Sequence, residues 1–143
     1  MKENVLVSTC LLGKRDKYNG YDNLSEQVVA LKSKYNFIPV CPEVIGGLST
    51  PRNPAEQQGD KVIDNQGNDV TLQFVDGAKK VLAIAQKHNC TKAILKAKSP
   101  SCGANKVYDG TFTKTLIDGH GVTAKLLIDN GIQVFNENDI EKL

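Results

Sequence analysis

Long hydrophobic runs are absent from this sequence, which limits where the protein can reside. The apolar run nearest its start, Val5–Val7, is much shorter than the hydrophobic region of a signal peptide. No stretch approaches the roughly 20 apolar residues that span a bilayer. We therefore expect no membrane segment and a cytoplasmic protein.

A strong excess of one sign of charge is also lacking. The 143 residues carry a net charge of +2, too small for the broad basic face with which nucleic-acid binders neutralise several phosphates. Internal repeats and low-complexity segments are absent too, and a hydrophobic content of 40% is ordinary for a globular chain. We predict one domain over residues 1–143, a monomer or homodimer whose partner is a small molecule rather than duplex nucleic acid.

Two kinds of apolar pattern alternate along the chain. Compact runs of β-branched and aliphatic residues predict four strands, over Val5–Ser8, Phe37–Val40, Lys92–Lys98 and Ile132–Phe135. Apolar residues at helical spacing predict three helices between them, over Leu24–Tyr35, Leu72–His88 and Ala124–Ile128. The polar residues 49–60 are predicted as a loop, and residues 61–68 as a short excursion of the chain that contains a turn.

Strands and helices that alternate in this order are typical of an α/β fold. We predict a single-domain, mainly parallel sheet of about four or five strands with helices on both faces, a Rossmann-like three-layer sandwich. Ligands of such sheets bind in the crevice beyond the carboxyl ends of the strands. Residues that directly follow different strands should therefore meet at one edge.

Three of the four cysteines directly follow predicted strands. Cys10, Cys41 and Cys102 each lie beside prolines, glycines or hydroxyl residues, whereas Cys90 follows a helix and is interpreted as a partly buried thiol. Disulfides are disfavoured in a reducing compartment. The shared placement of the three thiols therefore predicts a joint site.

The absence of any Cys-x-x-Cys pair excludes a zinc ribbon and a ferredoxin-type run. Three soft thiolates still suit zinc or an iron–sulfur cluster better than magnesium or calcium. If the site holds a four-iron cluster, three thiolates leave one iron open to an exogenous ligand.

Five short motifs point to a known family. They are Ser-Thr-Cys-Leu-Leu-Gly at 8–13, Pro-Val-Cys-Pro-Glu-Val-Ile-Gly-Gly-Leu at 39–48, Thr-Pro-Arg at 50–52, Lys-Ser-Pro-Ser-Cys-Gly at 98–103 and Tyr-Asp-Gly-Thr-Phe at 108–112. In order and context they resemble the bacterial thiouracil desulfurase family, over nearly the whole chain.

The resemblance implies a cofactor, a reaction and a set of residues. The cofactor is an oxygen-sensitive [4Fe-4S] cluster held by Cys10, Cys41 and Cys102, and the reaction removes sulfur from 2-thiouracil or a related thiolated pyrimidine. Glu43 and Ser101 match acid–base and substrate-binding positions beside the cluster.

The residues themselves suggest how this chemistry proceeds. Attack of water on the thiocarbonyl carbon needs a base, and Glu43, two residues beyond a predicted ligand, is our hypothesis for it. Ser99 and Ser101 offer hydroxyls that bind the ring edge or relay a proton, and Thr9 and the backbone N–H groups around Gly103 offer further substrate contacts. The alternative role of Ser99 and Ser101 is to cap the loop or the turn that follows.

Two other classes of protein remain open at this stage. One is a non-catalytic domain in which the same thiols hold zinc or sense oxidants, and the other is a sulfur carrier with Cys102 as nucleophile. The roles of three further residues are undecided. His120 is expected to be solvated, Arg52 to form a surface ion pair, and Asp109 to stabilise a turn.

Overall fold

The computed structural model describes residues 2–143 and contains one sheet of four parallel strands. In order across the sheet these are β2 (Tyr35–Val40), β1 (Glu3–Ser8), β5 (Lys92–Ile94) and β8 (Gln133–Phe135). The predicted parallel α/β sheet is therefore confirmed, with four strands at the predicted places in the sequence.

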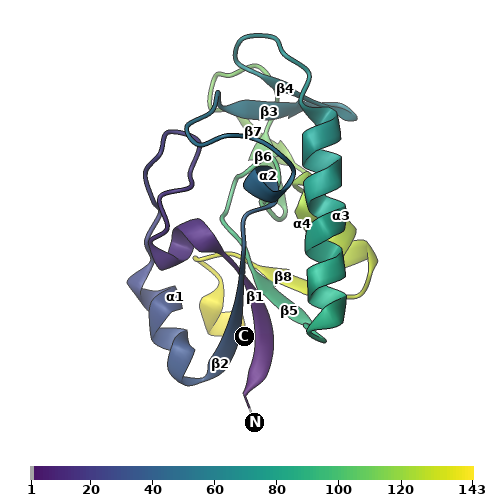
Figure 1. Cartoon of the computed structure of the whole chain (residues 1–143). Helices are drawn as coiled ribbons and strands as arrows, with labels where there is room; N and C mark the ends of the chain where they lie inside the picture. The colour runs from purple at the N-terminus through teal and green to yellow at the C-terminus, as the bar shows by residue number, and fades with distance from the viewer. Residues whose placement is uncertain (1) are drawn as a thin grey trace.

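Helices cover both faces of the sheet, as predicted (Figure 1). On one face α3 (Thr71–Lys87) and α4 (Val122–Asp129) pack against side chains such as Leu6. On the other face α1 (Glu26–Ala30) packs against Val5 and Val7. Alternate residues of β1 thus enter two separate apolar clusters, which is why the whole run is buried.

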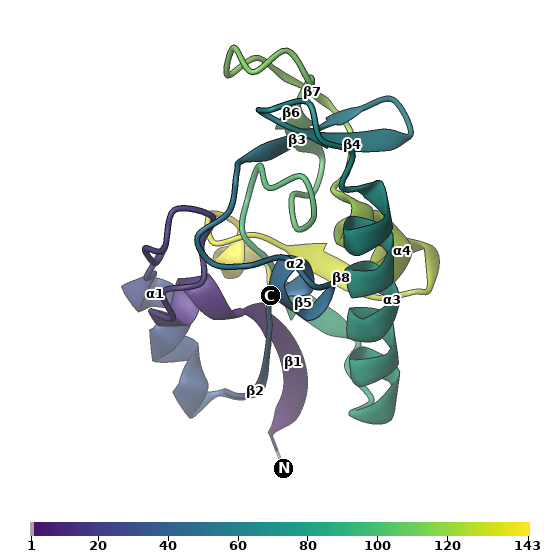
Figure 2. The same ribbon diagram turned by 45° about the horizontal axis from the view of Figure 1, so that its top comes forward.

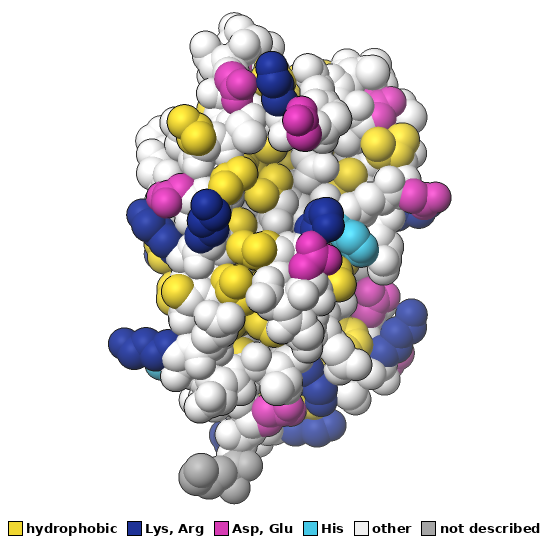
Figure 3. All heavy atoms as spheres, turned by 90° about the vertical axis from the view of Figure 1, so that its right-hand side faces the viewer, with side chains coloured by type: hydrophobic (Ala, Val, Ile, Leu, Met, Phe, Trp, Pro, Cys, Tyr) yellow, Lys and Arg dark blue, Asp and Glu magenta, His cyan; other side chains and the backbone are white. Residues whose placement is uncertain are grey.

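The outer surface of α3 and α4 combines charged and apolar side chains. Figure 3 shows apolar atoms gathered in a band between Lys, Arg, Asp and Glu side chains. The exposed apolar residues of the two helices include Leu72 and Ile128, at 81% and 37% exposed. Within residues 2–143, no helix is both long and apolar enough to cross a bilayer.

The predicted helix over Leu24–Tyr35 is shorter in the structure. The Ser25 hydroxyl accepts a hydrogen bond from the Val28 N–H and begins α1, and a 3₁₀ turn, η2 (Leu31–Ser33), ends the helical segment. Tyr35 is the first residue of β2, but it packs in the same apolar cluster as Val28. The helical spacing therefore reflected shared burial and not one continuous helix.

The predicted strand over Lys92–Lys98 also ends early, because side chains replace the sheet partners of its second half. The Lys96 N–H donates to the Ser8 hydroxyl at 3.0 Å, and the Ala97 N–H donates to the Glu137 carboxylate at 2.8 Å. The chain leaves the sheet at this point and runs along the carboxyl edge of β1.

Two antiparallel hairpins lie beyond that edge (Figure 2). They are β3 (Ala55–Gln58) with β4 (Lys61–Asp64), and β6 (Lys106–Tyr108) with β7 (Leu116–Asp118). The first was expected only as an excursion, and the second lies in a segment for which no strand was predicted. Each of these strands is three or four residues long, too short for a clear periodicity.

A short helix, α2 (Pro42–Ile45), follows β2 and lies unusually close to α3. A Cβ atom on Gly46 would lie 2.1 Å from the Gln73 carbonyl oxygen, and one on Gly77 would lie 2.0 Å from the Pro42 oxygen. Only glycine permits this approach. The contact fixes the start of α2, and hence Cys41 and Glu43, against the long helix.

Candidate functional site

A cavity of about 440 Å³ lies at the carboxyl ends of β1, β2 and β5, bordered by the two hairpins. Its wall includes Cys10, Cys41 and Cys102, which come from three separate segments of the chain. Among residues 2–143 all the cysteines are free thiols. The structure thus brings together the three cysteines that the sequence placed after strands.

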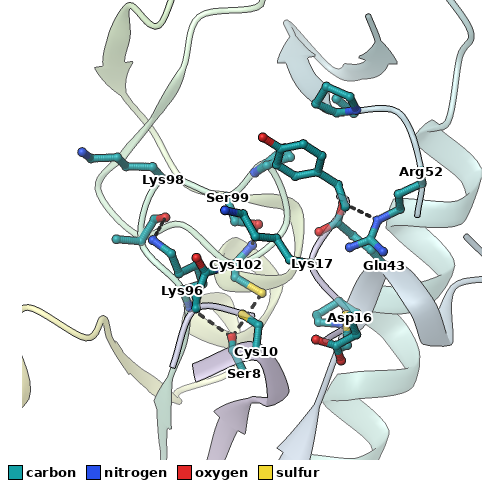
Figure 4. Close-up of a pocket in the computed structure, with 18 of the residues that line it drawn as sticks. Ser8, Cys10, Asp16, Lys17, Glu43, Arg52, Lys96, Lys98, Ser99 and Cys102 are labelled. Atoms are coloured by element: carbon teal, nitrogen blue, oxygen red, sulfur yellow. Dashed lines mark hydrogen bonds and ion pairs between the residues drawn. The ribbon is translucent and has the colours of Figure 1, made fainter. Parts of the chain in front are cut away.

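Each of these thiols is placed by the end of a strand. Cys10 lies in the 3₁₀ turn η1 (Thr9–Leu12) after β1, Cys41 is the residue before α2, and Cys102 lies in the turn that follows the extension of β5. The Ser8 hydroxyl donates to Cys102 Sγ at 3.6 Å and accepts from the Lys96 N–H at 3.0 Å. Figure 4 shows the sulfurs of Cys10 and Cys102 turned toward the same part of the cavity.

Burial keeps all three thiols protonated at neutral pH. It raises the pKa of Cys41 to about 11 and raises the pKa values of Cys10 and Cys102 as well. A thiol binds a metal as thiolate, so a metal at this site must displace these protons. Within the described residues, no three Cys, His, Asp or Glu side chains converge closely enough to hold one metal ion in common.

Glu43 and Arg52 form an ion pair in the cavity wall. Arg52 Nε lies 3.5 Å from Glu43 Oε1, and the Arg52 and Glu43 side chains are 6% and 18% exposed (Figure 4). The Arg52 N–H donates to the Tyr18 carbonyl at 2.7 Å, which ties the pair to the loop after Cys10. Burial raises the pKa of Glu43, and the charge of Arg52 acts against this. Arg52 was expected in a surface ion pair, but its pair is buried beside the thiols.

Asp16 is a residue of the cavity that sequence reasoning missed. It is 4% exposed, and one carboxylate oxygen accepts a hydrogen bond from the Thr9 hydroxyl. Its Oδ1 is buried and has no hydrogen-bond partner within residues 2–143. Its negative charge contributes to the raised pKa values of Cys10, Cys41 and Glu43. Asp16 lies in a polar loop without regular structure, so no periodicity in the sequence marked it.

Two of the predicted substrate-binding residues lie in the cavity wall. Thr9 is largely buried and donates its hydroxyl to Asp16. The Ser99 hydroxyl accepts from the N–H groups of Ser101 and Cys102, at 3.1 and 3.0 Å. Ser99 therefore stabilises the turn that carries Cys102 while it faces the cavity.

Ser101 and Gly103 are not among the residues that form the cavity wall. The Ser101 side chain is fully buried, and its hydroxyl lies 2.7 Å from the Thr123 hydroxyl of α4. The Gly103 N–H donates to the Ser99 carbonyl at 2.8 Å and is therefore not free to donate to a substrate. The geometry gives both residues a supporting position behind Cys102, and a direct catalytic role for Ser101 stays a prediction.

The remaining candidates take structural positions. Cys90 is 6% exposed and packs in the core with α3 and α4. His120 was expected to be solvated, but it is partly buried, because its Nδ1 accepts a hydrogen bond from the Asn105 N–H at 3.0 Å. The Asp109 carboxylate accepts from the Thr111 N–H and hydroxyl, as expected of a turn residue.

The fold and the cavity together define a class: a small α/β protein with a thiol-lined cavity suited to soft-metal chemistry at the carboxyl edge of its sheet. Within that class, the chain belongs to the 2-thiouracil desulfurase family, whose family model matches residues 5–139. The resemblance seen in the motifs is thereby confirmed.

Two known proteins are similar over nearly the whole chain. The uncharacterized protein YbbK of Bacillus subtilis (strain 168) is 41% identical over 149 residues, covering 97% of this chain and 99% of that protein. The solved structure of a protein described as [4Fe-4S]-dependent thiouracil desulfidase TudS has 42% sequence identity and a TM-score of 0.94. That match covers 99% of this chain and 95% of the other.

Proposed function

We propose that this protein is a [4Fe-4S]-dependent desulfurase that removes sulfur from 2-thiouracil or a related thiolated pyrimidine. The observation that carries the proposal is the convergence of Cys10, Cys41 and Cys102 on one cavity that also contains the Glu43–Arg52 pair. Membership of the 2-thiouracil desulfurase family and the likeness to TudS support the same activity.

The donor set fits an iron–sulfur cluster better than a zinc ion. In a tetrahedral zinc site, Zn–S bonds of about 2.3 Å bring the sulfurs within about 4 Å of one another. Three such donors do not meet around one point within residues 2–143. In a cluster each thiolate binds a different iron, so wider spacing around a shared cavity is what the ligands require.

The net reaction exchanges sulfur for oxygen at one ring carbon. Water adds to the thiocarbonyl carbon, the C–S bond breaks, and the products are the oxo-pyrimidine and hydrogen sulfide, with no change in oxidation state. The cluster, when bound, supplies a Lewis-acidic iron with affinity for soft sulfur.

The protein's own part is to activate water and to keep the base in place. Glu43 accepts the proton of the attacking water, and its raised pKa makes it a better base than an exposed carboxylate. Arg52 fixes the carboxylate through its Nε, and donates from Nη1 to the Ser49 carbonyl and the Thr50 hydroxyl. Burial of the pair keeps the carboxylate at the edge of α2, within the same cavity as the thiols.

Anaerobic purification tests the proposal directly. The protein should be brown, contain about four irons and four sulfides per chain, and convert 2-thiouracil to uracil with release of sulfide. A colourless protein with stoichiometric zinc would support the zinc-site alternative. Sulfide release that survives removal of iron would instead support Cys102 as nucleophile: its thiolate would add to the thiocarbonyl carbon and expel hydrogen sulfide, and water would then hydrolyse the new C–S bond to give the oxo-pyrimidine and the free thiol.

A further inference from the structure

The loop 109–115, which joins β6 to β7, has an unusual backbone conformation beside the cavity. Phe112 and Lys114 have φ angles of 59° and 61°, in the left-handed region that bulky residues rarely adopt. Such conformations are costly and persist where surrounding contacts impose them, often at ligand sites. Both residues also contribute to the cavity wall.

Glu56 of β3 contacts the backbone of this loop at Phe112. Its Oε1 accepts hydrogen bonds from the N–H groups of Gly110 and Phe112, at 3.0 and 3.2 Å. The Gly110 carbonyl accepts from Gln58 Nε2 at 3.0 Å. A Cβ atom on Gly110 would lie 2.6 Å from the Gln57 carbonyl oxygen, so the loop lies directly on β3. The Glu56 carboxylate is thus the side chain that holds the backbone of Phe112 itself against β3.

The Phe112 ring is poorly buried for an aromatic side chain. It remains 36% exposed although it lies in the wall of the same cavity as the three thiols. Tyr18 and Tyr108 contribute to that wall as well. Aromatic side chains bind nucleobases by packing against the flat face of the ring, which every pyrimidine offers.

We propose that Phe112 packs against the ring of the thiolated pyrimidine and that Glu56 is a positioning residue that holds Phe112 in place. This inference rests on the function proposed above. It also gives a role to the Tyr-Asp-Gly-Thr-Phe motif at 108–112, which the cluster and the acid–base chemistry leave unexplained. In that motif Gly110 allows contact with β3, Asp109 and Thr111 close the turn, and Phe112 meets the substrate.

Substitution of Phe112 tests the ring contact. Phe112→Ala should raise the KM for 2-thiouracil about 5- to 100-fold and weaken binding of the product uracil by a similar factor, with unchanged iron content. Phe112→Tyr retains the ring and should stay within about threefold of the wild type. Leu116→Ala is a matched control, because Leu116 is 37% exposed on the same hairpin and lies outside the cavity wall. Wild-type uracil affinity in Phe112→Ala would overturn the proposal.

A double-mutant cycle tests the role of Glu56. Glu56→Ala should raise KM as Phe112→Ala does, and the double variant should be no worse than Phe112→Ala alone, because Glu56 acts through Phe112. Hydrogen exchange at the amides of Gly110 and Phe112 should accelerate in Glu56→Ala and be partly restored in Glu56→Gln. Fully additive effects on uracil affinity, or unchanged exchange at both amides, would show that Glu56 does not position Phe112.

The outcomes separate this inference from the proposed function. Sulfide release by the wild type reports on the reaction. The uracil affinity of the variants reports on the ring contact, whether or not the wild type releases sulfide. A wild type that releases sulfide, together with a Phe112→Ala variant of normal uracil affinity, would retain the function and refute the ring contact.

Discussion

The three thiols of the cavity hold their protons more firmly than a cysteine in water, because burial disfavours the thiolate. At neutral pH they are therefore weakly reactive in the absence of a metal, and a metal that binds them displaces their protons. This property argues against nucleophilic or redox roles without a metal, which need a lowered thiol pKa.

Individual Cys→Ser variants should separate the ligands from the fourth cysteine. We expect Cys10→Ser, Cys41→Ser and Cys102→Ser each to lose most of the bound iron after anaerobic purification, since each removes one of only three thiolates. Cys90→Ser is the matched control, because Cys90 is buried away from the cavity and should leave the iron content unchanged. Equal iron in all four variants would contradict the ligand set.

Glu43→Gln should retain the cluster and lose turnover. The amide keeps the shape of the side chain but cannot accept the proton of water, so kcat should fall about 100- to 10,000-fold at unchanged iron content. Steady-state sulfide release measures the effect. Near-normal turnover would remove Glu43 from the mechanism.

Asp16→Asn should make the thiols more reactive. The negative charge of Asp16 helps to raise the pKa values of Cys10 and Cys41, so its removal should lower both and increase thiol alkylation severalfold. The rate is measured on cluster-free protein at mildly alkaline pH, with alkylated sites assigned by mass spectrometry. Thr9→Val removes the hydrogen bond to Asp16 but keeps the charge, and should leave the rate close to that of the wild type.

At the scale of elements, the contact between α2 and α3 fixes the position of Glu43, the proposed base. Gly77 lies in the middle of α3, where glycine is unfavourable for a helix, yet its lack of a side chain allows α2 to approach. Cys41 and Glu43 lie at the start of α2, so any shift of this short helix displaces one predicted ligand and the proposed base together.

Gly77→Ala should therefore destabilise the protein despite its better helix propensity. The added methyl group would clash with the backbone at Pro42, and we expect a loss of about 1–3 kcal/mol in the free energy of unfolding together with lower iron content. Urea denaturation measures the first and iron analysis the second. Lys79→Ala, on the exposed side of the same helix, should change stability by less than about 0.5 kcal/mol.

For the whole molecule, the buried thiols make stability depend on pH when no metal is bound. The Cys41 pKa is 9.0 in an unfolded chain and about 11 in the folded protein. The folded state therefore binds more protons between these values, and stability falls as pH rises through this interval. Below pH 9 the contribution is fully present.

Cluster-free protein should thus lose about 2–3 kcal/mol of stability from Cys41 between pH 9 and 11. Urea midpoints across this range test the slope. Because lysines and tyrosines titrate in the same interval, the Cys41→Ser variant isolates the thiol and should show a shallower decline. An identical decline in both proteins would contradict the assignment.

The match between sequence and structure differs from one part of the chain to another. The central strands were predicted correctly because a strand that is buried on both faces of the sheet has an unbroken run of apolar residues, as Val5, Leu6 and Val7 show. The hairpins were not, because their strands are short and partly exposed. The predicted helix end at Tyr35 was wrong because Tyr35 is buried in the same cluster as Val28 although it belongs to a strand. The predicted strand end at Lys98 was wrong because side-chain hydrogen bonds take the place of strand pairing at Lys96 and Ala97.

By itself, the sequence determined the parallel sheet and the convergence of its three strand-end thiols. Both follow from local apolar patterns and from the rule that parallel strands end at one edge. Only the tertiary structure decided that Arg52 pairs with Glu43, that Asp16 lines the same cavity as the thiols, that Ser101 turns toward α4, and that Glu56 accepts a hydrogen bond from the Phe112 N–H. These contacts depend on the three-dimensional path of loops and short strands, which carry no periodic signal from which their partners could be predicted.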